Sequence, residues 1–291
     1  MAQSPSPREL RFTVNGMNFA AQEWGDSTQL PVLALHGWLD NAASFFALAP
    51  RLNNLHIVAL DMAGHGQSDH RPGQMAYTPL DDINDILAVA DYLGWSRFAL
   101  LGHSRGAIIG TLAAGAFPER FIALGLVEGL LPEPARPEDA PRQLASAIQG
   151  LRVQQQKTPS VYPDINIAIK ARERGMFPLG HEAAKALTER GVIAQAGGGV
   201  SWSTDPRLLA PSMLKLSREH LHAFVDHVGA PIKLILADEG LPKLYANYLQ
   251  EVEQFPRVDY EVLSGGHHLH MEQEVDLVAE RLNDFFSRFT Q

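Results

Sequence analysis

Residues 102–106 constrain the fold of this chain more than any other stretch. They read Gly-His-Ser-Arg-Gly, so that Ser104 stands between two glycines in the pattern G-x-S-x-G. An apolar run at residues 98–101 precedes the pattern, and small and apolar residues follow it at 107–114. This order is typical of a strand, a sharp turn and a helix. The residues that flank the serine nearly touch in such a turn, and glycine fits there because it has no Cβ.

The same turn makes Ser104 a candidate nucleophile. It exposes the serine Oγ above the N-terminus of the following helix, where the helix favours a developing negative charge. The alternative is an ordinary glycine-rich turn between a strand and a helix. The apolar runs on both sides of the pattern favour the nucleophile.

Short apolar runs recur along the chain and predict a buried sheet. Residues 10–14 and 17–21 alternate in polarity around Asn15-Gly16, which predicts a β-hairpin. Further strands are predicted at residues 32–35, 56–60, 98–101, 122–127, 232–237 and 260–263. Helices are predicted at residues 82–93, 106–116 and 272–289. Continuous apolar strands that alternate with helices indicate an α/β fold with a mostly parallel central sheet and flanking helices.

The pattern changes between residues 130 and 228. Strand-like runs stop there, and helix-forming stretches appear at residues 143–156, 165–174 and 182–190. We therefore predict a core made of residues 1–129 and 229–291, with a helical lid inserted at residues 130–228. A glycine triplet at residues 197–199 is predicted to form a turn. It lacks the preceding strand and the following Lys-Ser/Thr of a phosphate-binding loop.

The composition of the chain indicates which kinds of partner it can bind and in which compartment it is expected. The 291 residues carry a formal net charge of −9, which argues against binding to nucleic acid, because that binding needs clustered lysines and arginines. No run approaches the ~20 apolar residues of a membrane span, and the first eight residues lack the apolar segment of a signal peptide. The chain has no cysteine, which excludes disulfides, thiolate metal ligands and a cysteine nucleophile. We expect a cytoplasmic globular protein that acts on a small molecule without a cofactor.

A serine hydroxyl needs a base within hydrogen-bond reach. Three histidines follow the last predicted strand, at positions 267, 268 and 270. His267 is the first candidate because it directly follows Gly266 in this loop, and His268 and His270 are alternatives. Three histidines in four residues also suggest a metal site, but the partner ligands and spacings of known zinc-binding patterns are absent from the sequence. We therefore predict no metal.

The base in turn needs a carboxylate that holds its tautomer and stabilises the imidazolium. Glu128 stands at the end of the strand after the helix predicted at residues 106–116, and Asp238-Glu239 stands at the end of the next strand. Both places are carboxyl ends of parallel strands, where catalytic groups gather, so location alone favours neither.

An oxyanion hole needs two backbone N–H groups. Arg105 directly follows the serine and is one candidate donor. Trp38 is the other, because it lies in the His-Gly-Trp segment after the predicted strand at 32–35. Its side chain either lines the pocket or packs in the core.

Together these motifs resemble the α/β-hydrolase superfamily. The matching segments are residues 36–38, 61–69, 102–106 and 266–267, in the order that the superfamily has them. The resemblance covers nearly the whole chain and is weakest across the lid. Residues 237–241 and 266–272 are similar more particularly to the serine hydrolase-like proteins. The resemblance implies an α/β-hydrolase fold, and it implies a structural turn rather than catalysis for residues 61–69.

The resemblance also bears on the acid. Many relatives carry Gly-x-x-Asp after the penultimate strand, and residues 237–240 align with it, so that Gly240 occupies the usual aspartate position. Some members, including a subset of the haloalkane dehalogenases, place the acid after the earlier strand instead. Glu128 lies 24 residues after Ser104, which is similar to that arrangement. The resemblance therefore favours Glu128, with Asp238 as the alternative.

The predicted function is hydrolysis of a carboxylic ester through an acyl-enzyme on Ser104, as in a carboxylesterase. A serine nucleophile argues against dehalogenation and epoxide hydrolysis, which use a carboxylate in these relatives. The same serine would also serve a thioesterase, an amidase, a C–C bond hydrolase or a perhydrolase. An alternative from another class is a receptor-like hydrolase fold that binds a ligand with negligible turnover.

Overall fold

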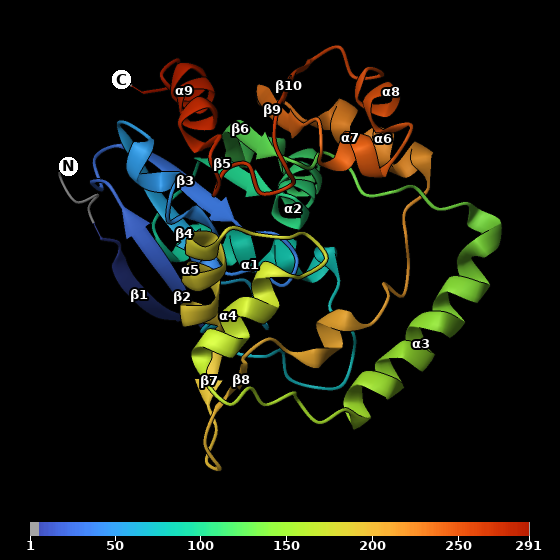
Figure 1. Ribbon diagram of the computed structural model, residues 1–291. Helices are drawn as coiled ribbons and strands as arrows, with labels where there is room; N and C mark the ends of the chain where they lie inside the picture. The colour runs from blue at the N-terminus through green and yellow to red at the C-terminus, as the bar shows by residue number, and fades with distance from the viewer. Residues whose placement is uncertain (1–5, 291) are drawn as a thin grey trace.

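The computed structural model describes residues 6–290. Eight strands form its central sheet: β1 (Arg8–Val14), β2 (Met17–Trp24), β3 (Leu30–Leu35), β4 (Leu55–Leu60), β5 (Phe98–His103), β6 (Phe121–Val127), β9 (Ile232–Ala237) and β10 (Val258–Leu263). Their spatial order is β1-β2-β4-β3-β5-β6-β9-β10 (Figure 1). The pairs β1–β2 and β2–β4 are antiparallel, and the other five pairs are parallel. The predicted α/β fold with a mostly parallel sheet is confirmed.

The hairpin at the N-terminal edge of the sheet is the predicted one. Val14 pairs with Met17 across the turn. Asn15 and Gly16 have φ of 52° and 74°. Positive φ at both positions is the conformation that Asn-Gly favours in a two-residue hairpin turn.

Helices cover both faces of the sheet. They are α1 (Pro79–Tyr92), α2 (Arg105–Ala116), α6 (Arg218–His227) and α8 (Tyr248–Val252) on one face, with α9 (Val275–Phe286) on the other. Side chains alternate between the two faces: in β3, Leu33 and Leu35 join the first buried cluster, and Val32 and Ala34 join the second. All four are fully buried, and this two-sided burial explains why the strand reads as a continuous apolar run.

A long segment between β6 and β9 holds most of the remaining elements. They are α3 (Ala140–Gln156), α4 (Ile165–Glu173), α5 (His181–Gly191), β7 (Val192–Ala194) and β8 (Val200–Trp202). The first three match the helices predicted in this segment. Figure 1 shows α3 at the right-hand edge, away from the sheet.

Two features of this segment differ from what the sequence suggested. The strands β7 and β8 pair as a small antiparallel hairpin around the glycine triplet. They went unpredicted because three residues are too short to display a period. The last helix, α6, packs against α2, with Leu221 and Val225 in the buried cluster of the sheet face. A lid boundary at residue 228 stays a prediction, and this helix lies on the core side of the segment.

An ion pair anchors the segment to the core. Arg190 of α5 donates from Nε to both carboxylate oxygens of Asp61, at 3.0 Å each. Asp61 also accepts from the backbone N of Ala42 and of Gln67, at 2.7 and 2.8 Å. This aspartate therefore ties together the loop after β3, the turn at 61–69 and α5.

Candidate active site

Ser104 lies at the sharp turn between β5 and α2. Its φ of 50° and ψ of −116° are strained for a residue with a side chain, and such strain costs about 1–3 kcal/mol. A Cβ at Gly102 would lie 2.5 Å from the Cα of Ala107, and one at Gly106 would overlap the backbone oxygen of Leu35. Only glycine therefore fits on either side of the serine.

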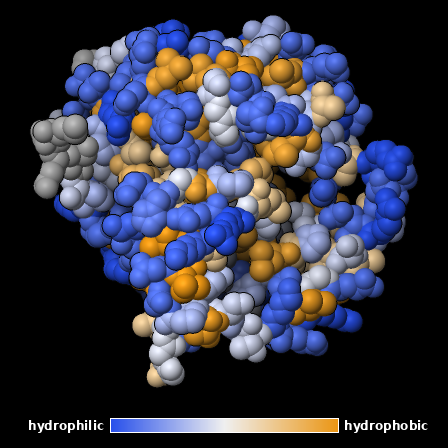
Figure 2. All heavy atoms as spheres, viewed as in Figure 1, coloured by the Kyte–Doolittle hydropathy of each residue, from blue (hydrophilic) through white to orange (hydrophobic). Residues whose placement is uncertain are grey.

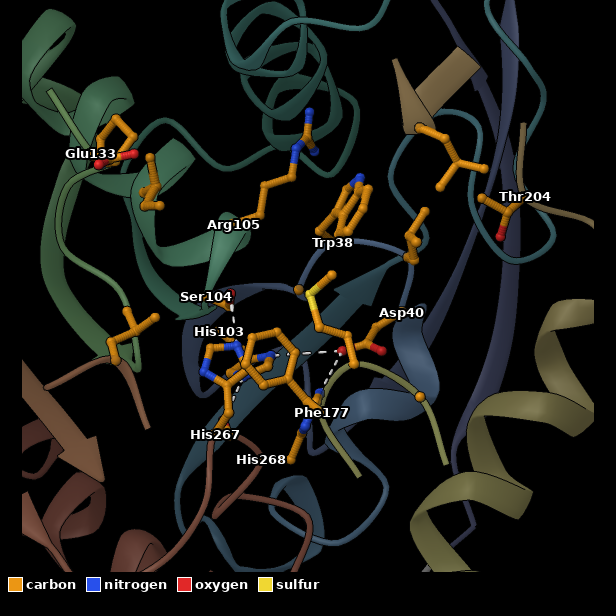
Figure 3. A pocket seen from close by; sticks show the side chains of 18 of the residues that line it. Trp38, Asp40, His103, Ser104, Arg105, Glu133, Phe177, Thr204, His267 and His268 are labelled. Carbon is orange, nitrogen blue, oxygen red and sulfur yellow. Dashed lines mark hydrogen bonds and ion pairs between the residues drawn. The ribbon is translucent and has the colours of Figure 1, made fainter. Parts of the chain in front are cut away.

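His267 lies within hydrogen-bond reach of Ser104. The loop after β10 places its Nε2 3.0 Å from Ser104 Oγ (Figure 3). On the other side of the ring, Nδ1 donates to Glu128 Oε2 at 2.8 Å. A proton on Nδ1 leaves the lone pair of Nε2 free to accept from the serine hydroxyl.

Glu128 is fully buried at the end of β6, where its backbone turns with φ of 52°. Its Oε1 accepts from the backbone N of Ala237 and its Oε2 from that of Leu241, each at 2.7 Å. A Cβ at Gly240 would overlap Oε2. The carboxylate thus occupies space that only a glycine at 240 leaves open.

The other candidate acid lies elsewhere. Asp238 is exposed, and its Oδ1 accepts from the backbone N of Gly265 at 2.9 Å. Of the two carboxylates, Glu128 is the one whose oxygen reaches His267.

The alternative bases also have other partners. Nε2 of His268 donates to Asp40 Oδ2 at 3.3 Å, and Nε2 of His270 shares a hydrogen bond of 2.9 Å with Ser44 Oγ. Burial, with the neighbouring histidines, holds the pKa of His270 well below its usual range. Of the three histidines after β10, His267 is the one beside Ser104.

Both candidate oxyanion donors line the same cavity as Ser104. Arg105 is the first residue of α2, so its backbone N–H has no partner within the helix. Its guanidinium turns away and pairs with Asp82 at 2.5 Å. The Trp38 indole donates to the backbone oxygen of Leu208 at 3.0 Å, which links the loop after β3 to the inserted segment. Their backbone roles stay predictions.

The cavity has a volume of about 1030 Å³ and lies between the carboxyl end of the sheet and the inserted segment. Figure 2 shows the surface hollowed between α3, at the right-hand edge, and the rest of the molecule. Phe177, in the loop between α4 and α5, stacks on His267 with ring centroids 4.2 Å apart and planes at 27°. Arg172 of α4 donates to Asp40 Oδ1 at 2.7 Å. Sequence reasoning missed both residues, because neither belongs to a local pattern.

His103, between Gly102 and the serine, is buried beneath the site. Its Nε2 donates to the backbone oxygen of His267 at 3.0 Å. Burial, with repulsion from neighbouring histidines, holds the pKa of His103 well below its usual range. Its neutral ring therefore braces the loop that carries His267.

Comparisons with known proteins agree with this architecture. Residues 31–154 match the family model described as the alpha/beta hydrolase fold. The chain is 30% identical to a serine hydrolase-like protein of Dictyostelium discoideum, over 88% of this chain and 75% of that protein. It is also 30% identical to the human serine hydrolase-like protein 2, over 98% of this chain and 96% of that protein.

Solved structures extend the similarity. A hypothetical protein of Pseudomonas aeruginosa PAO1 is 42% identical, with a TM-score of 0.92 over 96% of this chain and 99% of that one. A thioesterase domain from the curacin biosynthetic pathway is 26% identical, with a TM-score of 0.83 over 96% of this chain and all of that one. Within residues 6–290, every helix is too short or too polar to cross a membrane.

Proposed function

Because this chain belongs to the α/β-hydrolase fold family and to the serine hydrolase-like proteins within it, we propose that it hydrolyses carboxylic esters through an acyl-enzyme on Ser104. The observation that carries the proposal is the hydrogen-bonded series from Ser104 through His267 to Glu128. A serine hydroxyl becomes an effective nucleophile when an adjacent base, itself oriented by a third group, accepts its proton.

In the proposed reaction, Ser104 Oγ attacks the ester carbonyl while His267 Nε2 accepts the hydroxyl proton. Glu128 stabilises the imidazolium that forms. His267 then donates the proton to the departing alcohol, and the same nitrogen activates the water that releases the acid. The backbone N–H groups of Trp38 and Arg105 hold the oxyanion, and one such donor contributes roughly 10²–10³ to the rate.

The cavity supports a substrate of substantial size. Its volume of about 1030 Å³ reaches the upper end of ordinary ligand pockets, roughly 300–1,000 Å³. Thr158, Met176 and Phe177 of the inserted segment contribute to its walls. The segment therefore selects the acyl chain or the alcohol, and its movement admits the substrate.

Thioester hydrolysis is a second candidate. It is favoured by the 26% identity with the thioesterase domain, which extends over nearly the whole of both chains. The steps at Ser104 are the same, and only the leaving group changes from an alkoxide to a thiolate. A panel of p-nitrophenyl esters and acyl thioesters with matched acyl chains separates the two candidates.

A fluorophosphonate probe tests the nucleophile directly. We expect it to label the wild type and the Ser160→Ala control, whose serine also lines the cavity, but not Ser104→Ala. An unlabelled wild type, or equal labelling of Ser104→Ala, would contradict the proposal. Tight ligand binding that survives Ser104→Ala, without measurable turnover in the wild type, would favour the receptor-like alternative.

A further inference from the structure

Three buried side chains converge at the floor of the cavity, beside Ser104 and His267. They are Asp40 from the loop after β3, His103 from the end of β5 and His268 from the loop after β10 (Figure 3). Each is at most 4% exposed, and one ligand atom from each lies within 4.8 Å of the others. We call these three residues the Asp40 cluster.

Two acceptors face each other inside the cluster. The carbonyl oxygen of His267 can only accept, so the proton of His103 is on Nε2, and its Nδ1 presents a lone pair. That lone pair lies 3.8 Å from Oδ2 of Asp40. Within the described part of the chain, no group donates a hydrogen bond to His103 Nδ1. Two buried acceptors at this distance repel, and a cation between them turns the repulsion into attraction.

The types of side chain suit a metal ion. The cluster offers one carboxylate and two imidazoles, and each of these groups is a common ligand of divalent transition metals in proteins.

Although the spacing of the histidines along the chain predicted no metal, we propose that the Asp40 cluster binds one divalent transition-metal ion of the Zn²⁺ class. Tetrahedral ligands with bonds of about 2.0–2.1 Å lie roughly 3.3 Å from one another. Oδ2 of Asp40 lies 3.3 Å from Nε2 of His268 and 3.8 Å from Nδ1 of His103, and all three ligand atoms lie within 4.8 Å of one another, so the three side chains draw together when the ion binds. His268 coordinates through Nε2 when its proton moves to Nδ1. Two nitrogen ligands favour Zn²⁺ or Co²⁺ over Mg²⁺ and Ca²⁺, which take oxygen ligands.

A residue of the inserted segment weakens metal binding at the cluster. Arg172 pairs with the second oxygen of Asp40, and its positive charge repels a cation bound at the cluster. Metal affinity therefore rises when α4 moves away from the core. His103 and His268 are the chain neighbours of Ser104 and His267, and a bound cation opposes the imidazolium at His267. Inhibition by the metal follows; this consequence rests on the proposed function, whereas the metal site does not.

Titration of the whole protein with Co²⁺ tests the site. We expect one equivalent to bind with the visible absorption of a low-coordinate nitrogen and oxygen site, and Zn²⁺ to displace it. His268→Gln weakens binding at least about 100-fold, because loss of even an outer-shell partner costs 10–100-fold. His181→Gln, at an exposed histidine of α5, leaves binding unchanged. Arg172→Gln tightens it about tenfold, because a nearby positive charge is removed.

The wild-type spectrum alone can overturn the proposal, since absence of a saturable site at one equivalent contradicts it without any variant. Equal binding by wild type and folded His268→Gln also contradicts it, with folding checked by near-ultraviolet circular dichroism. If Arg172→Gln binds Co²⁺ more weakly than the wild type, the proposed position of the ion beside Asp40 is contradicted. If the protein binds one Co²⁺ but shows no esterase activity, the metal site is supported and the proposed function is contradicted.

Discussion

Replacement of Glu128 by glutamine tests which carboxylate supports His267. The buried carboxylate accepts from His267 Nδ1 and from the backbone N of Ala237 and Leu241. Glutamine has nearly the same shape, but it offers one oxygen and one NH₂ group. It cannot serve donors on both sides, and an NH₂ group that faces His267 favours the wrong tautomer.

The expected loss in kcat is about 10⁴, which corresponds to about 5.5 kcal/mol in the barrier. The cost to folding is smaller, because an unsatisfied buried donor costs about 1–3 kcal/mol against a typical total of 5–15 kcal/mol. Asp238→Asn is the matched control. This residue is exposed, and the amide oxygen can still accept from Gly265, so kcat stays within about twofold.

The assay is steady-state hydrolysis of the best p-nitrophenyl ester, with thermal unfolding measured on each variant. The reasoning is refuted if Glu128→Gln keeps more than a tenth of the wild-type kcat. It is also refuted if Asp238→Asn loses activity to the same degree while both variants stay folded.

Substitution of Gly240 is a second test of the same carboxylate. Gly240→Asp alone places a Cβ against Glu128 Oε2 and adds a second negative charge, so it inactivates the protein. In a Glu128→Ala background the space is open and the charge is restored from the neighbouring loop. We expect the double variant to exceed Glu128→Ala in kcat at least tenfold.

Three further predictions test the environment of the site. Phe177→Ala removes the ring stacked on His267, the proposed base, and lowers kcat about tenfold while fluorophosphonate labelling persists, as progress curves and mass spectrometry can show. Ser104→Gly relieves the positive φ and raises the free energy of unfolding by about 1 kcal/mol in urea titrations. His65, His103 and His270 have pKa values well below the usual range, chiefly through burial, so below pH ~6.5 only the unfolded chain binds their protons. Stability therefore decreases as the pH is lowered, by up to about 4 kcal/mol between pH 7.5 and 5.5, and a flat urea midpoint over this range would contradict the reasoning.

The central strands were predictable because burial on both faces leaves a continuous apolar run, as in β3 and β5. The ends of the helices were harder to predict than the strands. The first helix was predicted from residue 82 and begins at Pro79, where the side chain of Thr78 accepts from the backbone N of Asp81. The last helix was predicted at residues 272–289 and spans Val275–Phe286. The capping residue Thr78 decides where the first helix begins, whereas periodicity decides only that a helix exists.

The contacts of the cavity wall were not predictable in this way. Phe177 stacks on His267 only because the loop after α4 packs over the core. Asp40 and His103 stand inside recognisable motifs, but their convergence with His268 depends on three loops meeting at one edge of the sheet. Tertiary contacts of this kind leave no period and no spacing in the chain.

The structure explains why this chain can carry glycine at 240, the usual position of the aspartate, and glutamate at 128. The strands β6 and β9 are parallel neighbours, with Val127 beside Ile235, so the residue after β6 lies next to the loop after β9. The two strand ends therefore lie side by side near His267. Glu128 contacts His267 and accepts hydrogen bonds from the backbone of the loop after β9, while glycine at 240 leaves the space that the Glu128 oxygen occupies. The glycine and the glutamate are thus two parts of one arrangement, because a side chain at 240 would need the space that Glu128 occupies.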